Sequence, residues 1–145
     1  MQKLNYRKIN VQSYVPGKSN ILRKKNIIKL SANESALGQS PKSRKIISSI
    51  KKLDKYPDSK TRILRREISQ KFKCNFDQII CGSGSDEVIQ LLCQLFLQKK
   101  DEVIVPQYSF LMYRIYSNII GSKVIFSREN KFKVSVKGIL DKVSN

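Results

Sequence analysis

The stretch QIICGSGSDEVIQLLCQLFLQKKDEVIVP, residues 78–106, decides the fold. It holds a short apolar run at 78–81, a glycine turn at 82–85, a long apolar segment at 86–98 and a second short run at 102–106. Short apolar runs suit buried strands, and the segment between them is long enough for a helix. Strands that alternate with helices predict a layered α/β protein with a largely parallel sheet.

The chain beyond residue 106 continues the same alternation. Residues 110–120 predict a helix that ends at Gly121, residues 123–126 predict another strand, and residues 136–143 predict a final helix. Three short strands make a small sheet, and a parallel sheet must be covered on both faces. We therefore expect the sequence to hold only part of a sheet, cut off before its domain is complete.

The N-terminal third is less regular. Residues 1–25 contain a Pro-Gly pair and predict an irregular arm, and the apolar run at 27–30 predicts a short strand. Ser40 followed by proline is a good helix entrance, which predicts a helix to about residue 52. Apolar residues then recur at helical spacing over 63–72.

Composition narrows the class of protein. The chain has 145 residues and no histidine, which removes Ser-His-Asp and Cys-His catalysis. Cys74, Cys81 and Cys93 are odd in number and show no C-x-x-C spacing, so we expect reduced thiols, with neither a disulfide framework nor a metal site. No apolar run reaches the length of about 18 residues that suits a membrane helix. The N-terminus lacks a signal-peptide pattern, so a cytoplasmic protein is expected.

The net charge of +18 suggests a nucleic-acid-binding protein as a second class. The basic residues, however, are spread from Lys3 to Lys142 instead of forming one arm. We interpret them chiefly as solvated surface side chains, and the basic nucleic-acid-binding protein remains an alternative.

The turn at 82–85 is the first candidate site. Gly82 and Gly84 allow a sharp turn and a close approach of the backbone to a ligand, and the N–H groups at a helix start favour an anion. The turn has no Walker lysine and lacks the third glycine of a dinucleotide fingerprint. Asp86 and Glu87 would stabilise the helix without any ligand, and would repel a phosphate if they faced it. A plain turn and a phosphate site are both open at this point.

Tyr108 is the second candidate, because it closely follows the run at 102–106. Ligands of α/β proteins usually bind at the carboxyl ends of strands. An aromatic ring there can stack on a planar heterocycle, although a tyrosine at a strand end also commonly serves packing alone.

Longer motifs occur together in a fixed order. They are KLSANESALG at 29–38, YPD at 56–58 with ILRR at 63–66, GSGSDEVIQLL at 82–92 and DEVIVPQYSFLMY at 101–113. Together they resemble the N-terminal part of the histidinol-phosphate aminotransferase family, a branch of the fold-type I transaminases, over about residues 11–121. The chain departs from the family pattern at Ala36, where the family usually has proline, and at 98–100, where it usually has a Pro-Gly turn.

The resemblance implies an α/β fold. It implies an incomplete three-layer α/β/α large domain of a PLP-dependent transferase at 41–145, preceded by an N-terminal arm and small-domain segment at 1–40. The implied cofactor is pyridoxal 5′-phosphate (PLP), with its phosphate bound at Gly84, Ser85 and Asp86.

Further roles follow from the same resemblance. Tyr108 would stack on the cofactor ring, and Tyr56 would reach the cofactor phosphate of the neighbouring subunit in a homodimer. Tyr14 and Asn33 would line the pocket for the small-molecule substrates, an amino donor and a 2-oxo acid.

The implied activity is transamination between histidinol phosphate and 2-oxoglutarate in histidine biosynthesis. The family's Schiff-base lysine has no match in this sequence, so no catalytic residue is assigned and the chain alone is expected to be inactive. An aromatic aminotransferase or a threonine-phosphate decarboxylase is the alternative within the same class.

Overall fold

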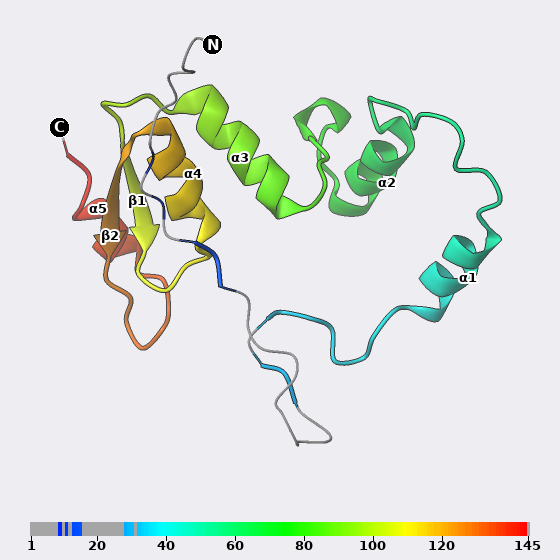
Figure 1. The fold of residues 1–145 in the computed structure, drawn as a ribbon, viewed down its shortest axis with the longest axis horizontal. Helices are drawn as coiled ribbons and strands as arrows, with labels where there is room; N and C mark the ends of the chain where they lie inside the picture. Colours follow the sequence, from blue (N-terminus) through cyan, green and yellow to red (C-terminus); the bar gives the residue numbers. More distant parts are fainter. Residues whose placement is uncertain (1–8, 10, 12, 16–27, 31, 145) are drawn as a thin grey trace, which may run out of the picture.

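The computed structural model of the chain describes residues 9, 11, 13–15, 28–30 and 32–144. Figure 1 shows α4 and α5 beside the two strands and α3 against α4, whereas α1 lies at the far end of an extended path. In chain order the elements are α1 (Pro41–Ser49), α2 (Arg62–Phe72), the 3₁₀ turn η1 (Phe76–Gln78), α3 (Ser85–Phe96), β1 (Glu102–Pro106), α4 (Met112–Ile120), β2 (Lys123–Ser127) and α5 (Val136–Leu140).

Strands β1 and β2 pair in parallel and form the sheet. Glu102 lies opposite Lys123, and the register runs to Pro106 opposite Ser127. Helix α4 connects the strands and packs on both of them, α3 packs on α4, and α5 contacts β1. The predicted α/β class with a parallel sheet is therefore confirmed for this part of the chain.

The predicted strand at 78–81 is wrong. The side chain of Asn75 accepts a hydrogen bond from the Asp77 N–H, and its own N–H donates to the side chain of Gln78. This capping box winds 76–78 into a 3₁₀ turn. Ile79 that follows is extended, but no described strand lies beside it to complete a ladder, and 73% of Ile80 is exposed.

The predicted strand at 27–30 is also absent where it can be checked. Residue 27 lies outside the described residues, as does most of the predicted arm at 1–25. Residues 28–30 form no strand, and Ile28 and Leu30 are both largely exposed. A short apolar run becomes a strand only when a neighbour supplies its hydrogen bonds and covers its side chains.

The predicted helices are confirmed, with shifted ends. Pro41 occupies the first turn of α1 as expected, although the Ser40 hydroxyl makes no capping hydrogen bond. Gly121 ends α4 in the left-handed region, with φ of 98°. Helices α1, α3 and α5 are each shorter than predicted at their C-terminal ends. None of the helices within the described residues has the length and apolar content that a membrane span requires.

Arg65 ties α2 to η1. Its guanidinium donates a hydrogen bond of 2.8 Å to the Phe76 carbonyl and lies 4.0 Å from the centre of the Phe76 ring. The Asp77 carboxylate is 3.6 Å from the same group. This contact holds the segment before the glycine turn against α2, the helix that contains ILRR.

The buried core is small and lies between α3, α4 and the strands. Cys93 and Val105 are its buried apolar residues in the described part of the chain, with Ser117, Ser122 and Ser127 buried beside them. Burial raises the pKa of the Cys93 thiol, with the Ser117 hydroxyl acting against it. By contrast, α3 leaves several large apolar side chains substantially exposed: Leu91, Leu92, Leu95 and Phe96.

We expect the isolated 145-residue chain to unfold without a sharp cooperative transition. Burying one such side chain contributes about 1.5–3 kcal/mol to the free energy of unfolding. The exposed side chains on α3 do not make this contribution, and its sum is a large share of a typical domain stability of about 5–15 kcal/mol. Urea unfolding followed by far-UV circular dichroism, with sedimentation of the same sample, measures this. A reversible two-state transition of a monomer would contradict the prediction.

Candidate functional site

The glycine turn at 82–85 is exposed and leads into α3. Gly84 has φ of 89°, in the region that disfavours residues with a Cβ, and a Cβ built there meets no atom within 4 Å. Ser85 and Asp86 follow as the first residues of α3, where N–H groups have no acceptor within the helix. The turn therefore offers N–H donors next to open space.

Gly82 makes room for side chains of α3. A Cβ at Gly82 would lie 2.8 Å from Glu87 Oε2 and 3.1 Å from Val88 Cγ2. The Glu87 carboxylate folds back over the turn and accepts a hydrogen bond from the Ser83 N–H. Gly82 therefore admits the Glu87 side chain, which stabilises the turn, while the space beside Gly84 is open.

The Asp86 side chain turns from the glycine turn towards α4. Its Oδ1 atom is buried and has no hydrogen-bond partner among the described residues. Burial, followed by the nearby Asp86 charge, raises the pKa of the Tyr116 phenol on α4. The carboxylate of Asp86 thus lies beside the phenol of Tyr116.

Tyr108 lies just beyond the carboxyl end of β1, as predicted. Its N–H donates a hydrogen bond of 3.2 Å to Glu129 Oε1, and its ring centre is 5.3 Å from that of Phe132. The side chain is 63% exposed. It borders an open groove of about 460 Å³ whose other lining residues are Gln107, Arg114, Phe126 and Arg128.

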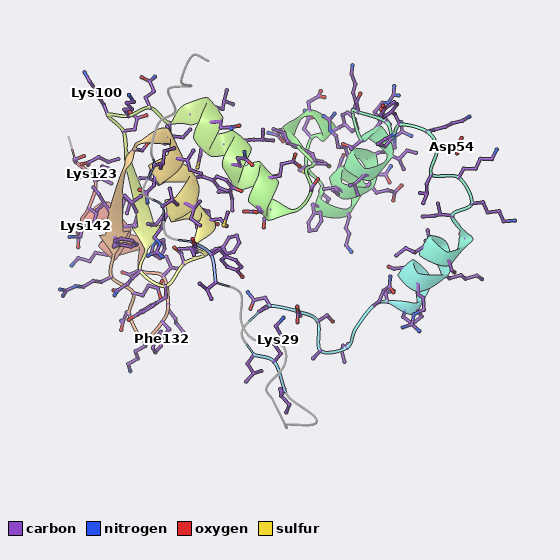
Figure 2. The ribbon with its side chains drawn as sticks, in the orientation of Figure 1. Lys29, Asp54, Lys100, Lys123, Phe132 and Lys142 are labelled. Atoms are coloured by element: carbon purple, nitrogen blue, oxygen red, sulfur yellow. The ribbon has the colours of Figure 1, made fainter. Side chains whose placement is uncertain are left out.

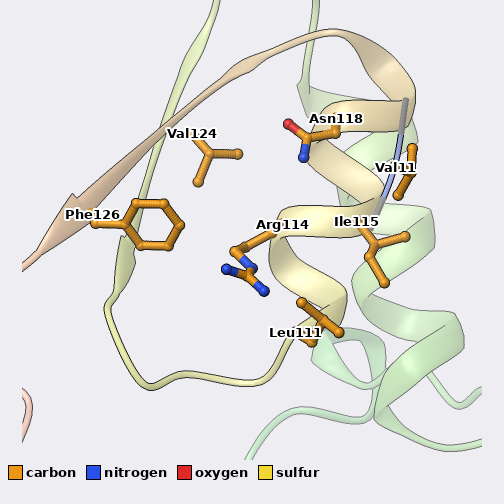
Figure 3. Close-up of a pocket in the computed structure, with 7 residues that line it drawn as sticks. All are labelled: Val11, Leu111, Arg114, Ile115, Asn118, Val124 and Phe126. Carbon is orange, nitrogen blue, oxygen red and sulfur yellow. The ribbon is translucent and has the colours of Figure 1, made fainter. Parts of the chain in front are cut away.

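A second hollow of about 320 Å³ lies between α4 and β2 (Figure 3). Arg114 lines both hollows, and its guanidinium carbon is 5.7 Å from the centre of the Phe126 ring. Val11 of the N-terminal segment covers this hollow from the side of Ile115. Val11, a residue of the predicted N-terminal arm, therefore lies against helix α4.

Three further predicted site residues lie before α2, and none of them makes a hydrogen bond or ring contact with Tyr108 that the described part of the chain records. Tyr56 is fully exposed in the connection between α1 and α2, and Asn33 and Tyr14 are exposed as well. Figure 2 places Asp54, two residues before Tyr56, at the opposite end of the molecule from Phe132. The role implied for Tyr56 concerns a neighbouring subunit, so a single chain does not test it.

Asp58, the last residue of the YPD motif, stabilises the start of α2. Its carboxylate accepts hydrogen bonds from the N–H groups of Lys60 and Arg62 and from Arg62 Nε, at 3.1, 3.0 and 2.9 Å. The Arg62 side chain is the main cause that lowers the pKa of Asp58 from 3.8 to about 2. Asp58 of the YPD motif thus caps the N-terminal end of α2.

Sequence reasoning missed the segment after β2. Glu129 and Phe132 both contact Tyr108, yet neither belongs to a motif and each is separated from Tyr108 by more than twenty residues. No local sequence pattern predicts these two contacts, because they form only when the chain turns back after the end of β2.

Comparison with known proteins identifies the class. The parallel β1–α4–β2 unit places the chain among α/β proteins. The sequence model of the family described as "Aminotransferase class I and II" matches residues 25–145. The chain belongs to this family of aminotransferases, whose members are generally PLP-dependent, and the resemblance found in the sequence is thereby confirmed.

Several curated relatives carry the name histidinol-phosphate aminotransferase. The protein of Pelagibacter ubique (strain HTCC1062) is 61% identical over 140 residues, which cover 96% of this chain and 39% of the relative. That of Rhodopseudomonas palustris (strain BisA53) is 38% identical over 94% of the chain and 38% of its own length. That of Rhodospirillum rubrum is 35% identical over 91% of the chain and 36% of its own length. The chain thus spans about two fifths of these relatives.

The first test of the site uses a chimaera in which this chain replaces the matching segment of the Pelagibacter ubique relative. We expect Asp58 to titrate near pH 2 there, measured by carboxyl-carbon NMR. Because the pKa of Asp58 is lowered on folding, the stabilisation of α2 is complete above the ordinary value of 3.8 and is lost as the pH falls towards 2. Arg62→Gln should return the pKa towards the ordinary value. A titration near 4 in the unmodified chimaera would refute the capping role.

Proposed function

We propose that this chain is the N-terminal part of a PLP-dependent aminotransferase that moves an amino group between histidinol phosphate and 2-oxoglutarate. The observation that carries the proposal is the 61% identity, over 96% of the chain, to a protein named histidinol-phosphate aminotransferase. The substrates would be small molecules, and the enzyme would act in histidine biosynthesis in the cytoplasm.

The glycine turn fits the phosphate of the proposed cofactor. Ser85 and Asp86 would donate their backbone N–H groups to it, and the dipole of α3 would favour its negative charge. The open space at Gly84 supports this fit, as does the orientation of the Asp86 carboxylate towards Tyr116. When bound, PLP supplies the electron sink for chemistry at the amino carbon of the substrate.

Tyr108 would hold the ring of the cofactor by stacking. Its position beyond the carboxyl end of β1 supports this role, because ligands of parallel sheets bind at that end. Its large exposed fraction leaves ring surface available for a planar partner. Figure 1 also shows that the N-terminal ends of α3 and α4 lie towards the end of the sheet at which β1 terminates.

The remaining assignments are proposals from the family. Tyr56 would contact the cofactor phosphate bound by the neighbouring subunit of a homodimer, and Tyr14 and Asn33 would line the substrate pocket. Residues 41–145 would form part of the large domain, and residues 1–40 the arm and small-domain segment.

The phosphate assignment is tested by Gly84→Val in the chimaera. We expect the dissociation constant for PLP to rise about tenfold or more, since a branched side chain would occupy the approach to the turn. Gly38→Val is the matched control, because Gly38 also has a positive φ and open space around it. It should impose comparable backbone strain and leave PLP affinity near the starting value. Unchanged affinity in a folded Gly84→Val chimaera would contradict the assignment.

We also predict that the isolated chain neither transaminates nor binds PLP through a lysine. The test is incubation with PLP, reduction with borohydride and peptide mapping. Labelling within residues 1–145 should be weak and scattered over many lysines, whereas the chimaera should be labelled once, outside this segment. Stoichiometric labelling of one lysine in the isolated chain would contradict the prediction that no lysine within residues 1–145 forms the Schiff base.

A further inference from the structure

The chain reverses in a tight hairpin directly after β2. Asn130 and Lys133 exchange both backbone hydrogen bonds, each of 3.0 Å, around a two-residue turn. Both turn residues have positive φ, 49° for Lys131 and 61° for Phe132. Two-residue hairpins require this conformation, and asparagine or glycine is the usual choice for it.

Phe132 is an unfavourable residue for this position. A left-handed backbone places the Cβ of a bulky residue too close to the following carbonyl oxygen. The burial of the ring does not compensate, because Phe132 is 82% exposed. Strained residues of this kind tend to occur where they serve a function.

The hairpin contacts Tyr108 at two points. The Phe132 ring lies 5.3 Å from the Tyr108 ring at an angle of 46° between their planes. Glu129, at the base of the hairpin, accepts the hydrogen bond from the Tyr108 N–H. Both the backbone and the ring of Tyr108 are therefore held by this one segment.

Helix α5 supports the base of the hairpin. The Ser135 hydroxyl accepts a hydrogen bond of 3.1 Å from the Gly138 N–H and caps the helix. A Cβ at Gly138 would lie 2.9 Å from the Arg128 carbonyl oxygen, so the helix packs closely against the chain that leads into the hairpin. Helix α5 therefore lies directly against the residue that precedes Glu129.

We propose that Phe132 is a positioning residue for cofactor binding: its strained turn holds the ring of Tyr108 ready for stacking on the pyridine ring of PLP. The inference rests on the proposed function, because it assigns to Tyr108 the ring-stacking role. Phe132 supports Tyr108 from the side of the hairpin and leaves most of the tyrosine surface open for the planar ligand.

The test is Phe132→Gly in the chimaera. Glycine removes the backbone strain, so the folded protein should be at least as resistant to urea, yet the ring that supports Tyr108 is lost. We expect the dissociation constant for PLP to rise about threefold to tenfold, measured by equilibrium binding. The circular dichroism of the bound cofactor should also decrease, since it depends on a fixed orientation of the ring.

Lys131→Gly is the matched control, because it relieves strain at the neighbouring residue and keeps the aromatic ring. It should leave PLP affinity and the circular dichroism band unchanged. Phe132→Asn, which tolerates the left-handed region, provides a second variant without the ring and should behave like Phe132→Gly. Phe132 is not a positioning residue if both ring-deleted variants bind PLP like the parent chimaera.

Tyr108→Ala separates this inference from the proposed function. If Phe132 acts through Tyr108, Phe132→Gly should have no further effect on PLP affinity in the Tyr108→Ala background. If Tyr108→Ala itself leaves PLP affinity unchanged, the proposed stacking role of Tyr108 is refuted. If Tyr108→Ala weakens binding and the ring-deleted Phe132 variants do not, only the inference about Phe132 fails.

Discussion

The parallel pairing of β1 with β2 is the constraint on which the arrangement of α4, α5 and the segments beyond the strands depends. Parallel strands cannot be joined by a tight turn, so the chain must cross over, and α4 makes that crossing while packing on both strands. The pairing brings the carboxyl ends of both strands to one edge. Tyr108 after β1 and the hairpin after β2 meet there because of it.

The two glycines of the turn at 82–85 have different surroundings. Gly82 makes room for the Glu87 side chain, whereas Gly84 leaves open space beside the first N–H groups of α3. Asp86 lies beside Tyr116, whereas the Glu87 carboxylate stays at the turn and accepts the Ser83 N–H. The two neighbouring acids of one motif therefore make different contacts.

The parts of the fold that sequence predicted are those set by local chemistry. Apolar spacing predicted α2, the length of the apolar segment predicted α3, Pro41 predicted the start of α1, and Gly121 predicted the end of α4. The strands expected at 27–30 and 78–81 failed for a different reason. A strand needs a partner, and near residue 78 the Asn75 capping box offered the backbone local hydrogen bonds instead.

The sequence by itself determined the α/β class, the family and the positions of the glycine turn and Tyr108, because each is recorded in residues that are close together in the chain. Only the tertiary structure decided that Glu129 and Phe132 contact Tyr108, and that Asp86 faces Tyr116. Such contacts join residues that are distant in sequence. They follow from strand register and helix packing, which short-range periodicity does not encode.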